Sequence, residues 1–138
     1  MMVEKYYLDT SIWMDYYEDR KDPSKDIGEF AFKLLVKLLA SKSTIVVSDF
    51  LLRELEVTYS LDKVRGMTLH FEHLMEKVSL SKEQNEEAKK IAEKRKIPKG
   101  DAIHAILARD NKAILVSRDN HFQKLRDICE VMKPEEII

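Results

Sequence analysis

The stretch YYLDTSIWMDYYED, residues 6–19, places a carboxylate where an apolar run ends and a helical pattern begins. Residues 3–8 are rich in Tyr, Val and Leu, which is typical of a short strand. Residues 11–17 then predict a short helix. Asp9 stands at the junction and has two interpretations. It caps the helix, because aspartate is a preferred N-cap residue, or it is a metal ligand at the end of a strand.

The length and composition predict one domain with a single core, covering residues 1–138. Hydrophobic residues make up 44% of the chain, which is enough for a packed interior. Charged residues make up 36%, against a usual share of about 25%, and this excess predicts a heavily ion-paired surface. The net charge is −1, so any binding of nucleic acid has to rest on a local site and not on an overall basic surface.

The sequence predicts a cytoplasmic protein without disulfides. Cys129 is the only cysteine, so an intramolecular disulfide is impossible, and its setting predicts a buried, inert thiol. The first residues carry charges and lack a long apolar segment, which argues against a signal peptide. No apolar run approaches the roughly 18 residues that a membrane span needs.

Strand patterns and helix patterns alternate along the chain. Strands are predicted at residues 3–8, 44–47, 77–80, 113–117 and 128–132. Helices are predicted at residues 11–17, from the Asp22–Ser24 loop through Leu38, at 49–59 with Ser48 or Asp49 as cap, at 67–77 after a break at Gly66, at 82–96 with a Ser81 and Gln84 capping box, and at 100–108. Pro134 is predicted to begin the tail. This alternation predicts an α/β domain with a mainly parallel sheet between helical layers.

Four acids fall near the carboxyl ends of the predicted strands, although about 110 residues separate the first from the last. They are Asp9, Glu54, Asp101 and Asp119. In an open parallel sheet, the carboxyl ends of the strands lie at one edge, where binding sites form. We therefore expect these four side chains to converge.

Converging carboxylates repel one another unless protons or cations intervene. Mg²⁺ and Mn²⁺ prefer oxygen ligands, whereas the cysteine and histidine spacings form no zinc pattern. Each acid taken alone also has a simpler interpretation. Asp9 is a helix cap, Glu54 faces solvent, Asp101 complements the helix dipole, and Asp119 caps the following turn.

Four blocks of sequence, taken in order, resemble the PIN-domain ribonucleases, of the compact kind found as the toxin in prokaryotic toxin–antitoxin pairs. The blocks are YLDTSIW, SDFLLRELE, KGDAIHAILA and ILVSRDNHF. The resemblance covers nearly the whole chain. It implies a Rossmann-like three-layer sandwich with about five mainly parallel strands, a pocket that holds one or two Mg²⁺ or Mn²⁺ ions, and single-stranded RNA as the substrate.

Carried over residue by residue, the resemblance makes Asp9, Glu54, Asp101 and Asp119 the catalytic and metal-binding acids. Ser11 and Ser117 match the small polar residues beside them, although Ser117 stands where the family often has Thr. The resemblance also implies a homodimer and an antitoxin protein as partner, with the aromatic first helix and the central helices as surfaces for them.

Basic residues beside the acids are candidates for binding the phosphates of RNA, and ordinary surface charge is the alternative for each. They are Arg53, Lys99, Arg118 and His121. His104 lies one helical turn from Asp101, so it faces the same cleft or packs between helices. Trp13, Tyr16 and Tyr17 stack on bases or, as we favour, belong to the core or an interface.

Three other functions were weighed against the nuclease. A haloacid-dehalogenase-like phosphatase needs a second Asp two residues after the first, and position 11 is Ser. A receiver-type signalling domain needs paired early acids and a late Lys, which this order of residues does not match. A non-catalytic PIN-fold module that binds RNA or protein stays open as the alternative, although the intact acids argue against it.

Overall fold

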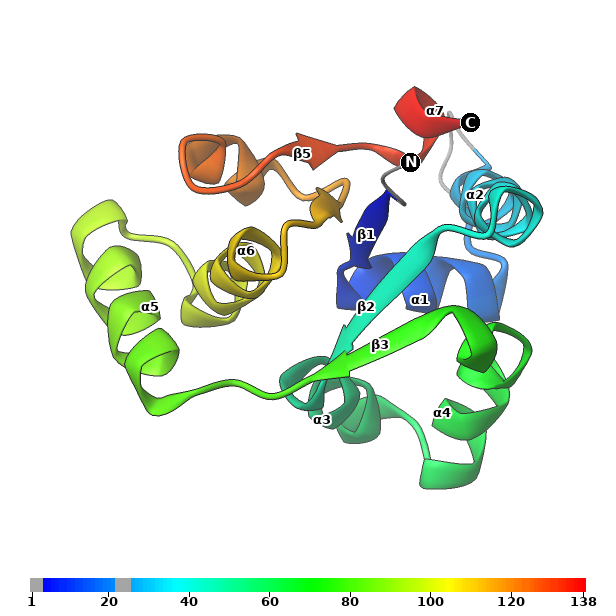
Figure 1. The fold of residues 1–138 in the computed structure, drawn as a ribbon, viewed down its shortest axis with the longest axis horizontal. Helices are drawn as coiled ribbons and strands as arrows, with labels where there is room; N and C mark the ends of the chain where they lie inside the picture. Colours follow the sequence, from blue (N-terminus) through cyan, green and yellow to red (C-terminus); the bar gives the residue numbers. More distant parts are fainter. Residues whose placement is uncertain (1–3, 22–25) are drawn as a thin grey trace.

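The computed structural model describes residues 4–21 and 26–138. Over these residues the chain forms a five-stranded sheet in the order β3-β2-β1-β4-β5, and all neighbouring strands are parallel. The strands are β1 (Lys5–Leu8), β2 (Thr44–Ser48), β3 (Met75–Val78), β4 (Ile114–Val116) and β5 (Val131–Met132). The predicted α/β class and the Rossmann-like three-layer arrangement are confirmed (Figure 1).

Helices connect the strands and cover both faces of the sheet (Figure 1). The α-helices are α1 (Thr10–Glu18), α2 (Ile27–Ser41), α3 (Asp49–Thr58), α4 (Leu61–Thr68), α5 (Lys82–Arg95), α6 (Lys99–Asp110) and α7 (Pro134–Ile137). Two 3₁₀ helices, η1 (Leu69–Leu74) and η2 (Asn120–Leu125), precede β3 and β5. None of these helices within the described ranges combines the length and apolarity that a membrane crossing needs.

The alternating side chains of β1 divide the core into two parts. Tyr6 and Leu8 belong to a cluster with residues of α1, α2, α3 and α4, whereas Tyr7 belongs to a cluster with residues of α5 and α6. Successive side chains of a strand point to opposite faces, so a central strand buried on both faces joins the two helical layers. The middle of α6 is buried, from Ala102 through Ala108, which explains why this stretch is nearly all apolar.

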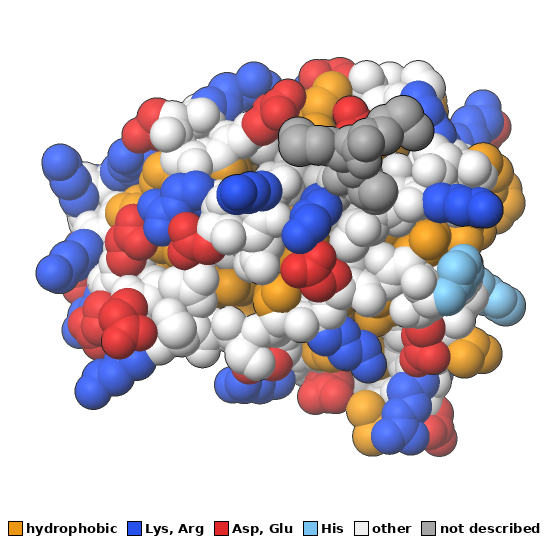
Figure 2. Space-filling model, in the orientation of Figure 1, with side chains coloured by type: hydrophobic (Ala, Val, Ile, Leu, Met, Phe, Trp, Pro, Cys, Tyr) orange, Lys and Arg blue, Asp and Glu red, His pale blue; other side chains and the backbone are white. Residues whose placement is uncertain are grey.

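Several local predictions are confirmed. Ser48 caps α3, and Ser81 and Gln84 form the predicted capping box at the start of α5. Cys129 is buried, and this burial raises the pKa of its thiol to about 11, as expected for an inert cysteine. Figure 2 shows basic and acidic side chains interspersed over the surface, and exposed ion pairs such as Arg95–Asp127 fit the predicted paired surface.

Some local predictions are wrong, and one lies partly outside the described residues. Gly66 does not break the chain but lies inside α4, because an exposed helix tolerates one glycine at a cost of about 1 kcal/mol. The tail that begins at Pro134, for which the sequence predicts no element, forms the short helix α7, since proline is well suited to the first turn of a helix. The predicted start of the second helix in the Asp22–Ser24 loop lies outside the described residues, and α2 is capped by Asp26.

Candidate active site

The site lies at the carboxyl ends of β1 and β4, where the direction of the chain across the sheet reverses. From β1 the chain continues to β2 and β3 on one side, and it then returns to place β4 and β5 on the other. Such a switch point leaves a crevice beyond the ends of the two central strands. Leu8 pairs with Val116 at these ends, so the residues that follow them, Asp9 and Ser117, are brought side by side.

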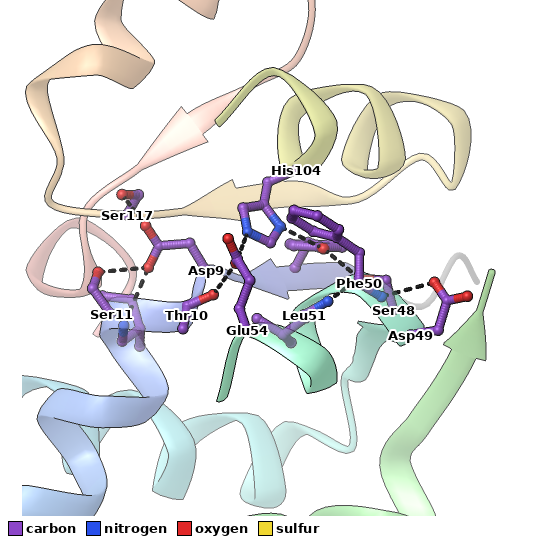
Figure 3. Close-up of polar contacts among 12 residues, drawn as sticks. Asp9, Thr10, Ser11, Ser48, Asp49, Phe50, Leu51, Glu54, His104 and Ser117 are labelled. Carbon is purple, nitrogen blue, oxygen red and sulfur yellow. Dashed lines mark hydrogen bonds and ion pairs between the residues drawn. The ribbon is translucent and has the colours of Figure 1, made fainter. Parts of the chain in front are cut away.

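Asp9 is both the cap of α1 and a buried member of the site, with 5% of its surface exposed. Its Oδ1 accepts hydrogen bonds from the Ile12 amide at 3.1 Å and from the Ser11 hydroxyl at 2.7 Å. Its Oδ2 accepts one from the Ser117 hydroxyl (Figure 3). Burial raises the pKa of Asp9, although the bonds from Ser117 and Ser11 oppose this. Asp9 is therefore the helix cap of the simpler interpretation, and it is also a carboxylate in a buried environment that disfavours its charged form.

Ser117 connects two of the predicted acids. While its hydroxyl donates to Asp9, it accepts a hydrogen bond from the Asp119 amide at 3.0 Å. The side chain of Asp119 in turn caps η2 by accepting from the His121 amide at 2.9 Å. The loop after β4 is thus held by hydrogen bonds that keep the two carboxylates on the same edge of the sheet.

Glu54 extends from α3 toward the same edge, and the prediction that it faces solvent when taken alone does not hold. Its Oε1 accepts a hydrogen bond from the Thr10 hydroxyl at 2.6 Å and lies 2.6 Å from His104 Nε2 (Figure 3). Burial alone raises the pKa of Glu54, but the hydrogen bond and charge of His104 and the bond from Thr10 bring it below its ordinary value. This carboxylate is therefore held in its charged form.

Asp101 and Asp119 form the more exposed side of the site, together with His121. His121 Nδ1 lies 3.1 Å from Asp101 Oδ2 and 3.2 Å from Asp119 Oδ1. Burial and the Asp119 carboxylate raise the pKa of Asp101, whereas the neighbouring histidines lower it. One ligand atom from each of these three residues lies within 4.8 Å of the others, a spacing that suits a shared cation.

All four predicted acids line one cavity of about 160 Å³ at the end of the sheet. Its lining residues are Asp9, Thr10, Ser11, Glu54, Asp101, His104 and Asp119. The chemistry of this donor set fits a hard divalent cation, because carboxylate and hydroxyl oxygens predominate in it. The raised pKa of Asp9 and of Asp101 fits as well, since a bound cation would favour the ionised form of both carboxylates.

The four predicted RNA-binding residues are placed differently. Arg53 is exposed on α3 beside Glu54 and pairs with Asp49 at 3.1 Å, and Lys99 is exposed at the start of α6. His121 is part of the acidic cluster. Arg118 forms a half-buried ion pair with Glu135 at 2.7 Å, and its guanidinium lies over the Phe30 ring. As RNA contacts, all four stay predictions.

The structure also settles residues that the sequence left open or did not suggest. Trp13 is fully buried in the core, as favoured. His104 both lines the cavity and packs against Tyr7 of β1 and Phe50 of α3. Thr10 was not predicted, because its bond to Glu54 joins α1 to α3 and depends on tertiary packing. The adjacent Asp9 was its only signal in the sequence.

Comparisons with known proteins agree with this geometry. The family model of the PIN domain matches residues 6–128. Similar solved structures include VapBC2 from Rickettsia felis bound to a promoter DNA fragment (19% identity, TM-score 0.67, covering 94% of this chain and 98% of that one) and a toxin–antitoxin complex from Klebsiella pneumoniae (19% identity, TM-score 0.63, covering 94% and 97%). FitAcB from Neisseria gonorrhoeae is similar at 16% identity and a TM-score of 0.61, covering 94% and 98%.

No curated protein matches the chain. At these identities the solved structures establish the fold, while the family model covers most of the sequence, including all four blocks and all four acids. The five-stranded parallel sheet and the acids at its switch point are what the resemblance implied. The chain belongs to the PIN domain family.

Proposed function

We propose that this protein is a divalent-metal-dependent endoribonuclease that cleaves phosphodiester bonds in single-stranded RNA, and that it acts in the cytoplasm as the toxin of a toxin–antitoxin pair. The observation that carries the proposal is the convergence of Asp9, Glu54, Asp101 and Asp119 on one cavity. Stability of the fold alone does not account for this convergence, because burial makes both Asp9 and Asp101 harder to ionise and such burial costs free energy.

In this proposal the four carboxylates hold one or two Mg²⁺ or Mn²⁺ ions. When bound, such an ion lowers the pKa of a water molecule and offsets the charge that develops on the phosphate. Ser11 and Ser117 keep the Asp9 carboxylate in one orientation through their hydrogen bonds. Thr10 and His104 do the same for Glu54. No nucleophilic side chain is required, because water attacks the phosphorus.

The basic residues are proposed to hold the phosphates on either side of the bond that is cut. Arg53 and Lys99 are exposed and lie one and two residues from Glu54 and Asp101 in sequence, which supports the proposal that they form the rim of the cavity. Their contribution is electrostatic and independent of base sequence. Arg118 is the weakest of the four candidates for this role, since Glu135 and Phe30 already engage its guanidinium.

The test is cleavage of a mixed pool of single-stranded RNA by wild type, Asp9→Asn and Asp26→Asn, each with Mn²⁺, with Mg²⁺ and with EDTA. Asp26 is the matched control, because it caps α2 through its side chain as Asp9 caps α1 but does not line the cavity. Asparagine is an equally good cap. We expect metal-dependent cleavage by wild type and Asp26→Asn and its loss in Asp9→Asn.

Two other outcomes would redirect the proposal. Cleavage that persists in EDTA and in Asp9→Asn would contradict the site and point to a contaminating nuclease. Absence of cleavage by the wild type under every condition would favour a PIN-fold module that binds RNA or protein without cutting, or a nuclease with a very narrow target. RNA binding measured on the same samples separates a binding module from an inactive preparation.

We further propose an antitoxin and a second copy of the chain as partners. Apolar side chains exposed on α2 and η1 support this: Phe32, Val36 and Leu69 are 55%, 47% and 60% exposed. A similar structure from Klebsiella pneumoniae is a toxin–antitoxin complex. Light scattering after size exclusion, with wild type and Phe32→Ser, tests the homodimer. A monomeric wild type across a wide concentration range would refute it.

A further inference from the structure

His104 is a buried histidine whose two ring nitrogens both have partners. Only 3% of the residue is exposed, although imidazole is polar. Its ring contacts two aromatic rings, with centroids 5.4 Å from that of Tyr7 and 5.2 Å from that of Phe50. Figure 3 shows Phe50 beside His104. Nδ1 lies 2.7 Å from the Tyr7 hydroxyl, and Nε2 lies 2.6 Å from Glu54 Oε1. Packing fixes the ring, and the ring in turn determines where the Glu54 carboxylate lies.

The contacts of Glu54 differ between its two oxygens. Oε1 accepts a hydrogen bond from the Thr10 hydroxyl of α1 and contacts Nε2 of His104 from α6, both at 2.6 Å. A carboxylate oxygen has about two lone-pair sites, so these two partners occupy Oε1. Oε2 lies against Gly100, where an added Cβ would stand only 3.1 Å from it. The oxygen left for a cation is therefore Oε2, on the side of the Asp101 helix.

A continuous chain of hydrogen bonds supports this arrangement. The Ser48 hydroxyl accepts from the Leu51 amide at 3.0 Å and lies 2.7 Å from the Tyr7 hydroxyl. Tyr7 leads to His104, and His104 leads to Glu54. The chain begins at the cap of α3 and returns to the same helix through β1 and α6. Three elements that meet at the edge of the sheet thereby determine the direction of one carboxylate.

We infer that His104 is a positioning residue for the metal site, which holds Glu54 Oε1 so that Oε2 is directed to the cation. The inference rests on the proposed metal-dependent function. Residues that hydrogen-bond to ligating side chains typically change metal affinity about 10- to 100-fold when they are lost. A histidine that only filled space between α6 and β1 would leave metal affinity unchanged once the protein folded.

Two substitutions separate the two contacts of the ring. Glutamine places its amide near the position of Nε2, so His104→Gln keeps a donor for Glu54. Asparagine places its amide near Nδ1, so His104→Asn keeps a partner for Tyr7 and loses the one for Glu54. His73→Asn, on an exposed histidine of η1 outside the cavity lining, is the matched control. Thermal unfolding in EDTA selects the variants that are folded.

The readout is the dissociation constant of Mn²⁺ measured by calorimetry without RNA. We expect His104→Asn to weaken Mn²⁺ binding about 10- to 100-fold, whereas His104→Gln and His73→Asn stay close to wild type. In a Glu54→Ala background, His104→Asn is expected to have no further effect, because the residue through which it acts is absent. Such a result would separate positioning of Glu54 from a general role in packing.

Three results would overturn the inference. Equal Mn²⁺ affinity in wild type and His104→Asn would reduce His104 to a packing residue. An undiminished effect of His104→Asn in the Glu54→Ala background would mean that it acts elsewhere. In both cases the proposed function would stand, since wild type binds the ion. A wild type that binds no Mn²⁺ would instead remove the proposed metal site itself, and the inference with it.

Discussion

The two sides of the acidic cavity are built in different ways. On the inner side, Asp9 and Glu54 receive hydrogen bonds from Ser11 and Thr10 of α1, from His104 of α6 and from Ser117 just after β4. On the outer side, Asp101 and Asp119 are more exposed and share the exposed imidazole of His121. The inner acids are part of the folded framework, whereas the outer acids are close to solvent. Substitutions on the two sides should therefore separate stability from metal binding.

The largest expected effect on stability comes from removing Asp9. Asp9→Ala deletes the cap of α1 and leaves buried donors of Ser117 and Ile12 without an acceptor. We expect a loss of about 2 to 4 kcal/mol in the free energy of unfolding in EDTA. Asp119→Ala, at an exposed position, should cost less than about 1 kcal/mol. Urea unfolding of both variants measures the difference, and equal losses would erase the distinction between the two sides.

Metal binding should depend on the outer side without changing the metal-free protein. Mn²⁺ at a hundred times its dissociation constant is expected to stabilise wild type by about 2.7 kcal/mol. Asp119→Asn should lose most of this gain while its stability in EDTA stays at the wild-type value. Thermal unfolding with and without Mn²⁺ provides the measurement. A full gain in Asp119→Asn would remove Asp119 from the set of ligands.

The dependence of stability on pH offers a finer comparison with an acid outside the cavity. Asp15 is buried in α1, and burial raises its pKa from 3.8 to about 6, partly opposed by Arg20. A raised folded-state pKa gives stability that is present below pH 4 and is lost as the pH rises through 6. We expect this loss to be about 3 kcal/mol for wild type relative to Asp15→Asn, since one pKa unit corresponds to about 1.4 kcal/mol.

Mn²⁺ should leave this difference unchanged, because Asp15 does not line the cavity. The pKa values of Asp9 and Asp101 are raised as well. Ionisation of these two carboxylates as the pH rises should therefore also destabilise the metal-free protein. Saturating Mn²⁺ should reverse that part, since the ion binds the ionised carboxylates. Stability curves from pH 4 to pH 8, recorded in EDTA and in Mn²⁺, provide the measurement. An equal response to Mn²⁺ from Asp15 outside the cavity and from Asp9 and Asp101 inside it would contradict this prediction.

The smallest expected effect concerns the rim. Arg53 is exposed and its ion pair with Asp49 lies at the surface, so Arg53→Ala should change the free energy of unfolding by less than about 1 kcal/mol. It should weaken RNA binding modestly and reduce the salt dependence by about one unit of slope. Arg118→Ala should instead lower the free energy of unfolding and leave RNA binding close to that of wild type, because Arg118 pairs with Glu135 and lies over Phe30. Binding isotherms at several salt concentrations distinguish the two arginines.

The topology of the sheet and the positions of the four acids could be predicted from the sequence. Apolar runs that end in Asp9 and just before Asp119 are strong signals, because strand ends in a parallel sheet share one edge. The third strand lies at residues 75–78 and not 77–80. It is an edge strand with only partly buried side chains, so its periodicity carries little information. The helical conformation of Gly66 was missed because a single local helix breaker does not override tertiary packing.

The side chains that orient Glu54 on the inner side of the cavity could not be predicted in the same way. The bonds of Glu54 to Thr10 and His104 span 44 and 50 residues, and no spacing rule connects positions in α1, α3 and α6. The register of β1 puts Tyr7 on the opposite face from Tyr6, but its hydroxyl contacts depend on side-chain packing. Acid positions follow from topology, whereas the residues that orient them follow from the packed structure.

The most direct measurement is a crystal structure of the wild type grown with Mn²⁺, with anomalous differences recorded for the ion. We expect an anomalous peak coordinated by carboxylates of Asp9, Glu54, Asp101 and Asp119, with Glu54 Oε1 still held by Thr10 and His104. The same crystals of Asp9→Asn should show the peak weakened or absent. A Mn²⁺-saturated crystal without a peak in this cavity, or with Mn²⁺ bound elsewhere at full occupancy, would contradict the proposed site.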